Sequence, residues 1–257
     1  MEEKDPPEGA LEEILARVRR VESSLQPEIA RAREIGSRVE AASRHATEGE
    51  HRLPVAAVIV LAIVLQLLLP QNLDIHPVWL FPTLEGALLI VLVAANPVRI
   101  NRTSKALRAT SVLLIALISL ANAWSSAELI NQLIGGGIGN DASLLLARGA
   151  SVYGMNIIAF ALWYWEWDTG GPVARRNATT RYPDFLFPQM TQSGIAPSDW
   201  RPTFVDYFYV SFTNATAFSP TDTMPLTRWA KMLMLVQSAI ALLTVAFVIA
   251  RAINVLK

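Results

Sequence analysis

The C-terminal stretch Asp206–Lys257 decides the fold, and it reads DYFYVSFTNATAFSPTDTMPLTRWAKMLMLVQSAIALLTVAFVIARAINVLK. It opens with a short aromatic segment, continues through a polar turn and ends in a long apolar run. A helix needs about 20 predominantly apolar residues to cross the hydrocarbon of a bilayer. We therefore expect a short helix that enters a membrane without crossing it, followed by a helix that crosses.

This stretch resembles the two-transmembrane potassium-channel module, in which an aromatic helix runs through a Phe into T-T-V-G-Y-G-D, with a Pro three residues after the Asp. Phe212, Thr216, Asp222 and Pro225 fall on these marks without a gap. The run Leu226–Arg251 resembles the inner helix of the module, with its long face of small and aliphatic residues. The resemblance covers the C-terminal part of the chain and implies a pore-loop protein that assembles as a homo-oligomer, a tetramer.

The filter of the module is not reproduced. Ala217 and Phe218 stand at the positions of the second Thr and the Val, and Ser219, Pro220 and Thr221 stand at those of Gly-Tyr-Gly. A potassium filter aims successive backbone carbonyls at the ion, and its glycines adopt backbone angles that other residues resist. A proline has a fixed φ and no N–H. We therefore do not expect potassium selectivity of the usual kind.

Hydroxyl, amide and carboxylate oxygens could still line a wet constriction for small cations. The candidate pore-lining residues are Thr213, Asn214, Thr216, Phe218, Ser219, Pro220, Thr221 and Asp222. Of these, Phe218 and Pro220 could instead close the path by a hydrophobic constriction. The alternative is a non-conducting membrane scaffold or interaction protein. In that case the same oxygens would bond inward, and Asp222 with Thr223 would cap the final helix.

Composition excludes several other classes of function. Hydrophobic residues make up 52% of the chain and the mean hydropathy is +0.34, which is typical of membrane proteins. The formal net charge is zero, so no basic surface for nucleic acid is expected. There is no cysteine, and the three histidines lie on different segments, so we expect no disulfide, metal site or cofactor. The sequence shows neither a paired nucleophile and base nor a phosphate loop, so we do not expect an enzyme.

The first 52 residues are charged and are expected to form a soluble amphipathic helix. Leu11, Ile14, Val18, Val21, Leu25, and then Ala32, Ile35, Val39 and Ala42 follow alternating steps of three and four, the seam of a coiled coil. Pro27 and Glu28 interrupt the seam and predict a kink or break there. This helix could join subunits, fold back on itself or lie along a membrane surface.

The chain is predicted to be an all-α polytopic membrane protein with about five transmembrane helices plus the short re-entrant helix. Residues 53–167 carry four of these helices, 168–203 form a polar, proline-rich loop, and 204–257 hold the pore-like segment and the final crossing. The expected crossings are Leu53–Pro70, Val78–Ala95, Leu107–Ala123, Ala142–Trp167 and Leu226–Arg251. We expect the long loop to pack somewhere through Phe185, Leu186 and Phe187, over the mouth of the pore-like element.

Several side chains inside these helices are polar or aromatic. Glu85 is either an ion or proton contact or a carboxylate near the interface that bonds to a neighbouring helix. Asn122, Asn156 and Gln237 are expected to hydrogen-bond between helices. The cluster Trp163, Tyr164, Trp165 and Trp167 is expected to form an interfacial aromatic belt, with ligand stacking as the alternative.

The link between the second and third helices fixes the expected orientation. Arg99, Arg102, Lys105 and Arg108 occur there without an acid, and such loops are cytoplasmic. We expect a multi-pass protein of the plasma membrane with a cytoplasmic N-terminus. Five crossings then place the pore-like loop in the opposite sense to the potassium-channel module. Either the module is inverted, or Trp124–Leu146 crosses once more, or the basic link is external.

Overall fold

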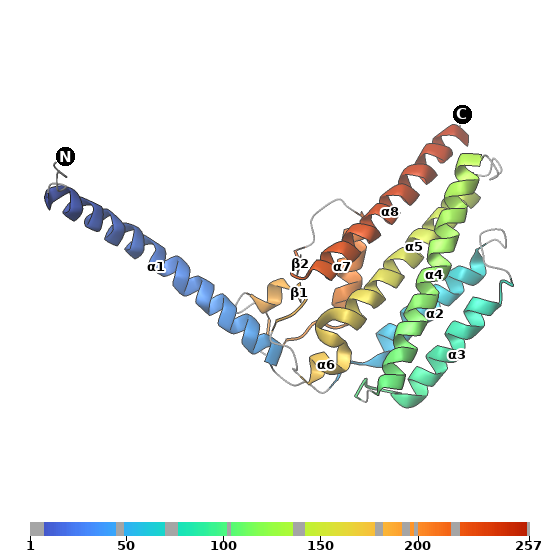
Figure 1. The fold of residues 1–257 in the computed structure, drawn as a ribbon. Coiled ribbons are helices and arrows are strands. Elements are labelled where there is room, and N and C mark those ends of the chain that lie inside the picture. Colours follow the sequence, from blue (N-terminus) through green and yellow to red (C-terminus); the bar gives the residue numbers. More distant parts are fainter. Residues whose placement is uncertain are drawn as a thin grey trace, which may run out of the picture.

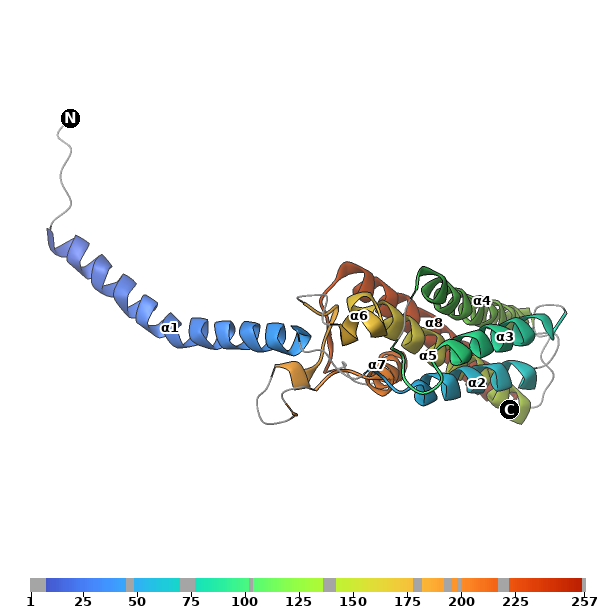
Figure 2. The ribbon, with the colours of Figure 1, turned by 90° about the horizontal axis from the view of Figure 1, so that it is seen from below.

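The computed structural model describes residues 8–44, 49–69, 77–101, 104–135, 142–177, 182–191, 196–197, 200–216 and 222–255. These residues form a helical bundle from which one long helix projects (Figures 1 and 2). The helices are α1 (Glu8–Arg44), α2 (Arg52–Leu68), α3 (Leu80–Ala95), α4 (Lys105–Gly135), α5 (Ala142–Trp167), α6 (Pro172–Arg176), α7 (Phe204–Thr216) and α8 (Arg228–Val255). Between them lie the short 3-10 turns η2 (Asp168–Gly170) and η3 (Pro188–Met190) and the two-residue strands β1 (Phe185–Leu186) and β2 (Met224–Pro225). The expected all-α class is confirmed.

Three of these helices are long and apolar enough to cross a membrane, namely α4, α5 and α8. The other two apolar helices are shorter, with 17 residues in α2 and 16 in α3. At 1.5 Å per residue, they are about 26 and 24 Å long, against a hydrocarbon thickness of about 30 Å. α4 runs unbroken for 31 residues, so the segment after Ala123 continues that helix and does not turn back to cross again.

α5 is the central helix of the bundle and contacts α2, α4, α7 and α8. Its side chains are apolar on all sides, and Val152, Met155, Ala161 and Leu162 are each fully buried. At Gly149 the neighbouring α8 comes so close that an added Cβ would lie 2.8 Å from Val248 Cγ2. α5 therefore forms the core on which the other helices pack.

The aromatic end of α5 packs inward, contrary to the predicted interfacial belt. Tyr164 and Trp165 are buried, and only Trp167 in this cluster exceeds a third exposed. Their rings contact aromatic rings from the long loop, α7 and α8, among them Phe185, Phe204 and Trp229. The belt prediction is therefore wrong for Tyr164 and Trp165, which protein covers, and stays a prediction for Trp163 and Trp167.

The projecting helix α1 is continuous through Pro27 and bends about half-way along its length (Figure 2). The prediction of a kink or break at this point is therefore met by a kink, as expected of a proline inside a helix. Among the described residues, α1 contacts the rest of the molecule near η3, at its C-terminal end, where Val39 is buried. The described apolar side chains along its length are exposed: Leu15, Val18, Val21, Leu25, Ile29 and Ile35.

Candidate functional site

The predicted re-entrant segment is α7, a helix of 13 residues, or about 20 Å. Asp206 closes its first turn, because Asp206 Oδ2 accepts hydrogen bonds from the Thr203 N–H at 2.7 Å and from the Thr203 hydroxyl at 2.9 Å. The Phe204 N–H also donates to the Glu50 carboxylate. These contacts fix the start of α7 at the junction of α1 and α2.

Three of the predicted pore-lining residues lie on α7, and their donors are used within the chain. The Thr213 hydroxyl donates to Tyr209 O at 2.9 Å, and the Thr216 hydroxyl donates to Thr213 O at 3.0 Å. Asn214 Nδ2 donates to Met234 O of α8 at 2.9 Å. Asn214 therefore ties the inner part of α7 to α8.

Gln237 of α8 is the centre of a buried polar network. Its Oε1 accepts a bond of 2.6 Å from the Tyr164 hydroxyl and one of 2.8 Å from Asn214 Nδ2. Its Nε2 donates to Ser211 O at 2.9 Å and to Ser211 Oγ at 2.7 Å. Ser211 in turn donates to Ile157 O of α5. One amide thus joins α5, α7 and α8, which confirms the predicted interhelical role of Gln237.

The remaining predicted pore-lining residues are Phe218, Ser219, Pro220 and Thr221, which lie outside the described residues, and Asp222. Asp222 is exposed. Its predicted role as the cap of the final helix is wrong, because α8 begins only at Arg228 and β2 lies between them. β2 pairs antiparallel with β1, so the chain returns to the long loop before α8 begins.

The described part of the long loop folds over the end of the bundle, as the sequence predicted for its aromatic residues. Asp168 is the anchor of this packing and is fully buried. Its carboxylate accepts bonds from the Tyr207 hydroxyl of α7 and from the Asp184 N–H, the latter at 2.8 Å. Thr169 has φ +52° and Gly171 has φ +98°, so a sharp reversal follows Asp168 and leads into α6.

Asp184 connects this loop to α8. Its Oδ2 accepts the Thr169 N–H at 2.8 Å, and its Oδ1 accepts the Trp229 indole N–H at 3.0 Å. Its backbone carbonyl accepts the Leu226 N–H at 2.8 Å. Phe185, the next residue, is fully buried against Tyr164, Tyr207 and Trp229. The starts of α7 and α8 are therefore held at the same end of the bundle.

Arg175 of α6 brings a positive charge to this end. Its Nη1 donates to Trp165 O at 2.6 Å and to Asp168 O at 2.9 Å, and its guanidinium lies over the Tyr207 ring at 4.9 Å. Its Nη2 lies 3.7 Å from Glu50 Oε2. Burial raises the pKa of the Glu50 carboxyl above its ordinary value, and the charge of Arg175 opposes that rise.

Glu85 lies elsewhere, inside the α2–α3 pair, and it is fully buried. Both of its carboxylate oxygens accept bonds from Gln66 Nε2 of α2, at 3.0 and 3.1 Å. This is the predicted bond to a neighbouring helix. By contrast, Asn156 is buried without a hydrogen-bond partner in the described structure for either amide atom, so its predicted interhelical bond is absent there. Asn122 Oδ1 is likewise buried and unbonded.

Sequence reasoning missed the lock formed by Glu50, Asp168, Arg175 and Tyr207. The available signal was the run WEWDTGGP, in which Asp168 and two glycines directly follow an apolar helix. Within the described residues, no group of three or more His, Cys, Asp or Glu side chains could hold a metal ion. The carboxylates of Glu50 and Asp168 in the lock accept hydrogen bonds from donors of the chain itself.

Comparison of the chain with models of protein families, with curated proteins and with solved structures finds no match.

Proposed function

We propose that the protein is a membrane-embedded homo-oligomer whose helices α7 and α8 form a pore module that passes small cations without a standard potassium filter. One observation carries the proposal. α7 begins at Phe204, whose N–H donates to Glu50, and it ends within the bundle at Thr216. The chain is next described at the end of the bundle where α7 began, and there β2 pairs with β1 and α8 begins. A short helix that enters and returns at one end is the arrangement that the resemblance to a potassium-channel module implies.

In this proposal the five apolar helices all cross the membrane. α2 and α3 are a few ångströms shorter than the usual hydrocarbon thickness, and a bilayer accommodates such a mismatch by local thinning at modest cost. The basic link between α3 and α4 then lies in the cytoplasm together with α1. This assignment is tested by attaching a membrane-impermeant thiol reagent to single cysteines at exposed Lys105 and exposed Ile134, because the chain has no cysteine of its own. Lys105→Cys should react only from the cytoplasmic side and Ile134→Cys only from the other.

A single re-entrant helix cannot enclose a path, so the proposal requires several copies. α7 has an exposed apolar face, formed by Val205, Tyr209 and Phe212, which is available to a neighbouring subunit. The exposed apolar seam of α1 is spaced as in a coiled coil and would join the copies outside the membrane. Deleting residues 1–44 should reduce the number of copies per detergent-solubilised particle, calculated from the protein mass measured by light scattering. An unchanged number of copies would retire the coiled coil.

A second candidate is the non-conducting scaffold, and one observation favours it. The donors of Thr213, Asn214 and Thr216 are all used within the chain, as expected for a packed helix that lines no water. In this case α7 is a wedge that braces α5 against α8, and α1 is the part that recruits partners.

Cation flux in proteoliposomes separates the two candidates. The wild type is compared for potassium, sodium and protons with Thr216→Trp, at the inner end of α7. The matched control is Leu242→Trp, at an α8 position that is 64% exposed. Flux that only Thr216→Trp blocks, with unchanged thermal unfolding, supports a path beside α7. No flux from a folded oligomer would sink the pore proposal and leave the scaffold.

A further inference from the structure

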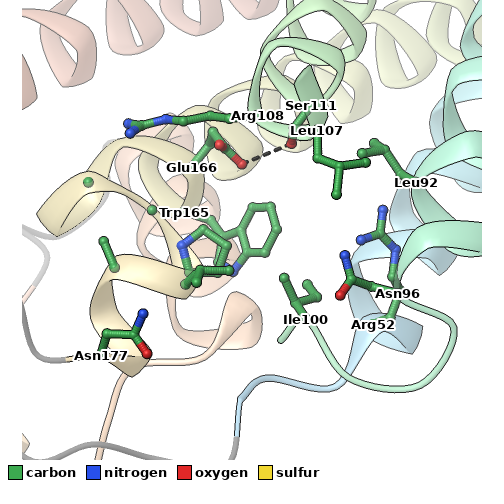
Figure 3. Close-up of a pocket in the computed structure, with 15 residues that line it drawn as sticks. Arg52, Leu92, Asn96, Ile100, Leu107, Arg108, Ser111, Trp165, Glu166 and Asn177 are labelled. Carbon is green, nitrogen blue, oxygen red and sulfur yellow. Dashed lines mark hydrogen bonds between the residues drawn. The ribbon is translucent and has the colours of Figure 1, made fainter. Parts of the chain in front are cut away.

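A cavity of about 260 Å³ lies beside the lock, at the same end of the bundle. Its walls come from the start of α2, the end of α3, the start of α4, the end of α5 and α6. Figure 3 shows Arg52 and Asn96 on one wall and Glu166 with Ser111 on another, with Trp165 between them. One water molecule occupies about 30 Å³ in the liquid, so the cavity has room for a small polar group.

Arg52, the first residue of α2, supplies the buried positive charge in this cavity, which the exposed Arg108 also lines. Only 7% of the residue is exposed, and its Nε is buried without a hydrogen-bond partner in the described structure. The backbone is fixed, because the Arg52 N–H donates to Val98 O at 3.0 Å. Burying a guanidinium is costly unless an acceptor compensates it. The buried guanidinium of Arg52 therefore has unused capacity for an anion.

Glu166, near the end of α5, supplies a negative charge across the cavity. It is 4% exposed, and the bond of 2.9 Å from the Ser111 hydroxyl to its Oε2 is its single hydrogen bond within the described structure. A carboxylate can accept about four hydrogen bonds. No ion pair within 4.0 Å joins Glu166 to Arg52 in the part of the chain that the structure describes. The cavity thus holds two separate buried charges of opposite sign.

We propose that this cavity binds a zwitterionic group with a phosphate and a primary ammonium, the head-group chemistry of an aminophospholipid. Arg52 and the Asn96 amide would hold the phosphate, and Glu166 would accept the N–H groups of the ammonium. A purely anionic ligand would be repelled by Glu166, and a purely cationic one by Arg52. The inference is independent of cation flux, although it shares with the proposed function the placement of this end at a membrane surface.

The depth of the cavity favours a lipid as the source of this group. Its polar residues lie in the terminal turns of apolar helices or just beyond them, which is the level of the head groups if these helices cross a bilayer. Apolar Leu92 and Leu107 also line it. Basic pockets between transmembrane helices on the cytoplasmic side are known to take lipid head groups. Soluble phosphoethanolamine would present the same chemistry without a lipid tail.

The test measures retained lipid and thermal stabilisation on the purified full-length protein in detergent. It is titrated separately with phosphatidylethanolamine, phosphatidylcholine, phosphatidylglycerol and soluble phosphoethanolamine, and bound lipid is counted by native mass spectrometry. Phosphatidylcholine carries a quaternary ammonium without N–H donors, and phosphatidylglycerol lacks the cation. We expect the wild type to retain phosphatidylethanolamine at least about tenfold better than either, the value of one charge-assisted hydrogen bond.

Three variants locate the binding. Arg52→Gln should abolish retention of phosphatidylethanolamine, and Glu166→Gln should remove the preference over phosphatidylglycerol while keeping an acceptor for Ser111. Lys105→Gln is the matched control, because Lys105 is an exposed cation at the start of α4 that does not line the cavity. Glu166, Arg52 and Arg108, which do line it, are labelled in Figure 3. If Arg52→Gln does not fold, the proposal is still tested by the head-group preference of the wild type and by the loss of that preference in Glu166→Gln.

Each outcome is decisive. Equal retention of all three lipids by the wild type would overturn the proposal. So would an equal loss in Lys105→Gln and Arg52→Gln, which would indicate general surface charge. Stabilisation by phosphoethanolamine but not by the lipid would support the chemistry and assign a soluble source. A normal lipid preference without cation flux would leave this inference standing while the pore proposal fell.

Discussion

Replacing Gln237 with Leu tests whether the buried amide network holds α7 in the bundle. The substitution keeps the approximate size of the side chain and removes four hydrogen bonds, two to Ser211 and one each to Tyr164 and Asn214. Asn214 retains its bond to Met234 O, and Ser211 retains its bond to Ile157 O. The Tyr164 hydroxyl loses its acceptor in a fully buried position. Most of the cost should therefore come from this hydroxyl.

Two routes give a similar magnitude. A buried polar group left without a partner costs about 1–3 kcal/mol. Hydrogen bonds between membrane helices average about 0.6 kcal/mol each, so four of them amount to about 2.4 kcal/mol. We expect Gln237→Leu to lower the free energy of unfolding by about 2 kcal/mol. The assay is reversible unfolding in mixed detergent micelles, followed by tryptophan fluorescence.

A double-mutant cycle with Tyr164→Phe isolates the stranded hydroxyl. The combined variant should be about 1 kcal/mol more stable than the sum of the two single effects, because Phe leaves nothing unbonded. Ser238→Ala is the neighbouring control, since Ser238 contributes one long bond of 3.2 Å to Asn214 O. A change below about 0.5 kcal/mol for Gln237→Leu, the usual effect of a surface substitution, would refute the view that this network holds α7.

Three further predictions concern Asp184 of the long loop, Glu50 of the lock, and the packing of α5 against α8. Asp184→Ala should lower the free energy of unfolding by about 2 kcal/mol or more, because the Thr169 N–H and the Trp229 indole N–H lose their acceptor. As a control, Asp222→Ala at an exposed position should change it by less than about 0.5 kcal/mol. Equal effects of the two substitutions in unfolding titrations would contradict the role of Asp184 in holding the loop to α8. Burial raises the pKa of Glu50 above 4.5, so the folded state binds the Glu50 proton more tightly than the unfolded state does. The stability that this proton contributes is complete below pH 4.5 and is lost as the pH rises through the pKa of Glu50 in the folded state. Thermal unfolding measured between about pH 4.5 and 7 should therefore show a steeper loss of stability in the wild type than in Glu50→Gln, and parallel curves would argue against it. Gly149→Ala should lower the free energy of unfolding by about 1–3 kcal/mol through overpacking against Val248, and Val248→Ala should restore it. Gly154→Ala should be nearly neutral, because its added Cβ would lie at an ordinary contact distance of 3.4 Å from Leu65 Cδ1. If Val248→Ala does not restore stability, the loss in Gly149→Ala has another origin.

The positions of the helices could be predicted from the sequence because each is a local pattern. The apolar runs that predict crossings after Leu53, Val78 and Ala142 correspond to α2, α3 and α5, with boundaries that differ by at most a few residues. The short length of α7 follows directly from the polar turn after Thr216. The predicted pairing of Glu85 with a neighbouring helix also needs only the cost of a carboxylate in an apolar segment.

The lock could not be predicted because its partners are far apart in the sequence. Trp165 Nε1 and the Phe204 N–H both donate to Glu50, across 115 and 154 residues. From the sequence alone, Glu50 is one more charged residue at the end of a polar segment, and Trp165 is predicted to be an interfacial aromatic residue. Their burial depends on the loop from Asp168 onward, whose course is set by Asp184 and Phe185 and has no helical or strand periodicity.

Glu50 also decides how the orientation conflict is resolved. Its backbone carbonyl accepts the Ile100 N–H from the basic link at 2.9 Å, and its carboxylate accepts the Phe204 N–H at the start of α7. The basic link and the entrance of α7 are therefore on the same side of any membrane that the bundle crosses. If the link is cytoplasmic, as its charge predicts, then α7 enters from the cytoplasm, in the opposite sense to the potassium-channel module. The continuous helix α4 argues against an extra crossing by residues 124–135. An inverted module and an external basic link remain as the alternatives, and the positive charge of the link favours the inverted module.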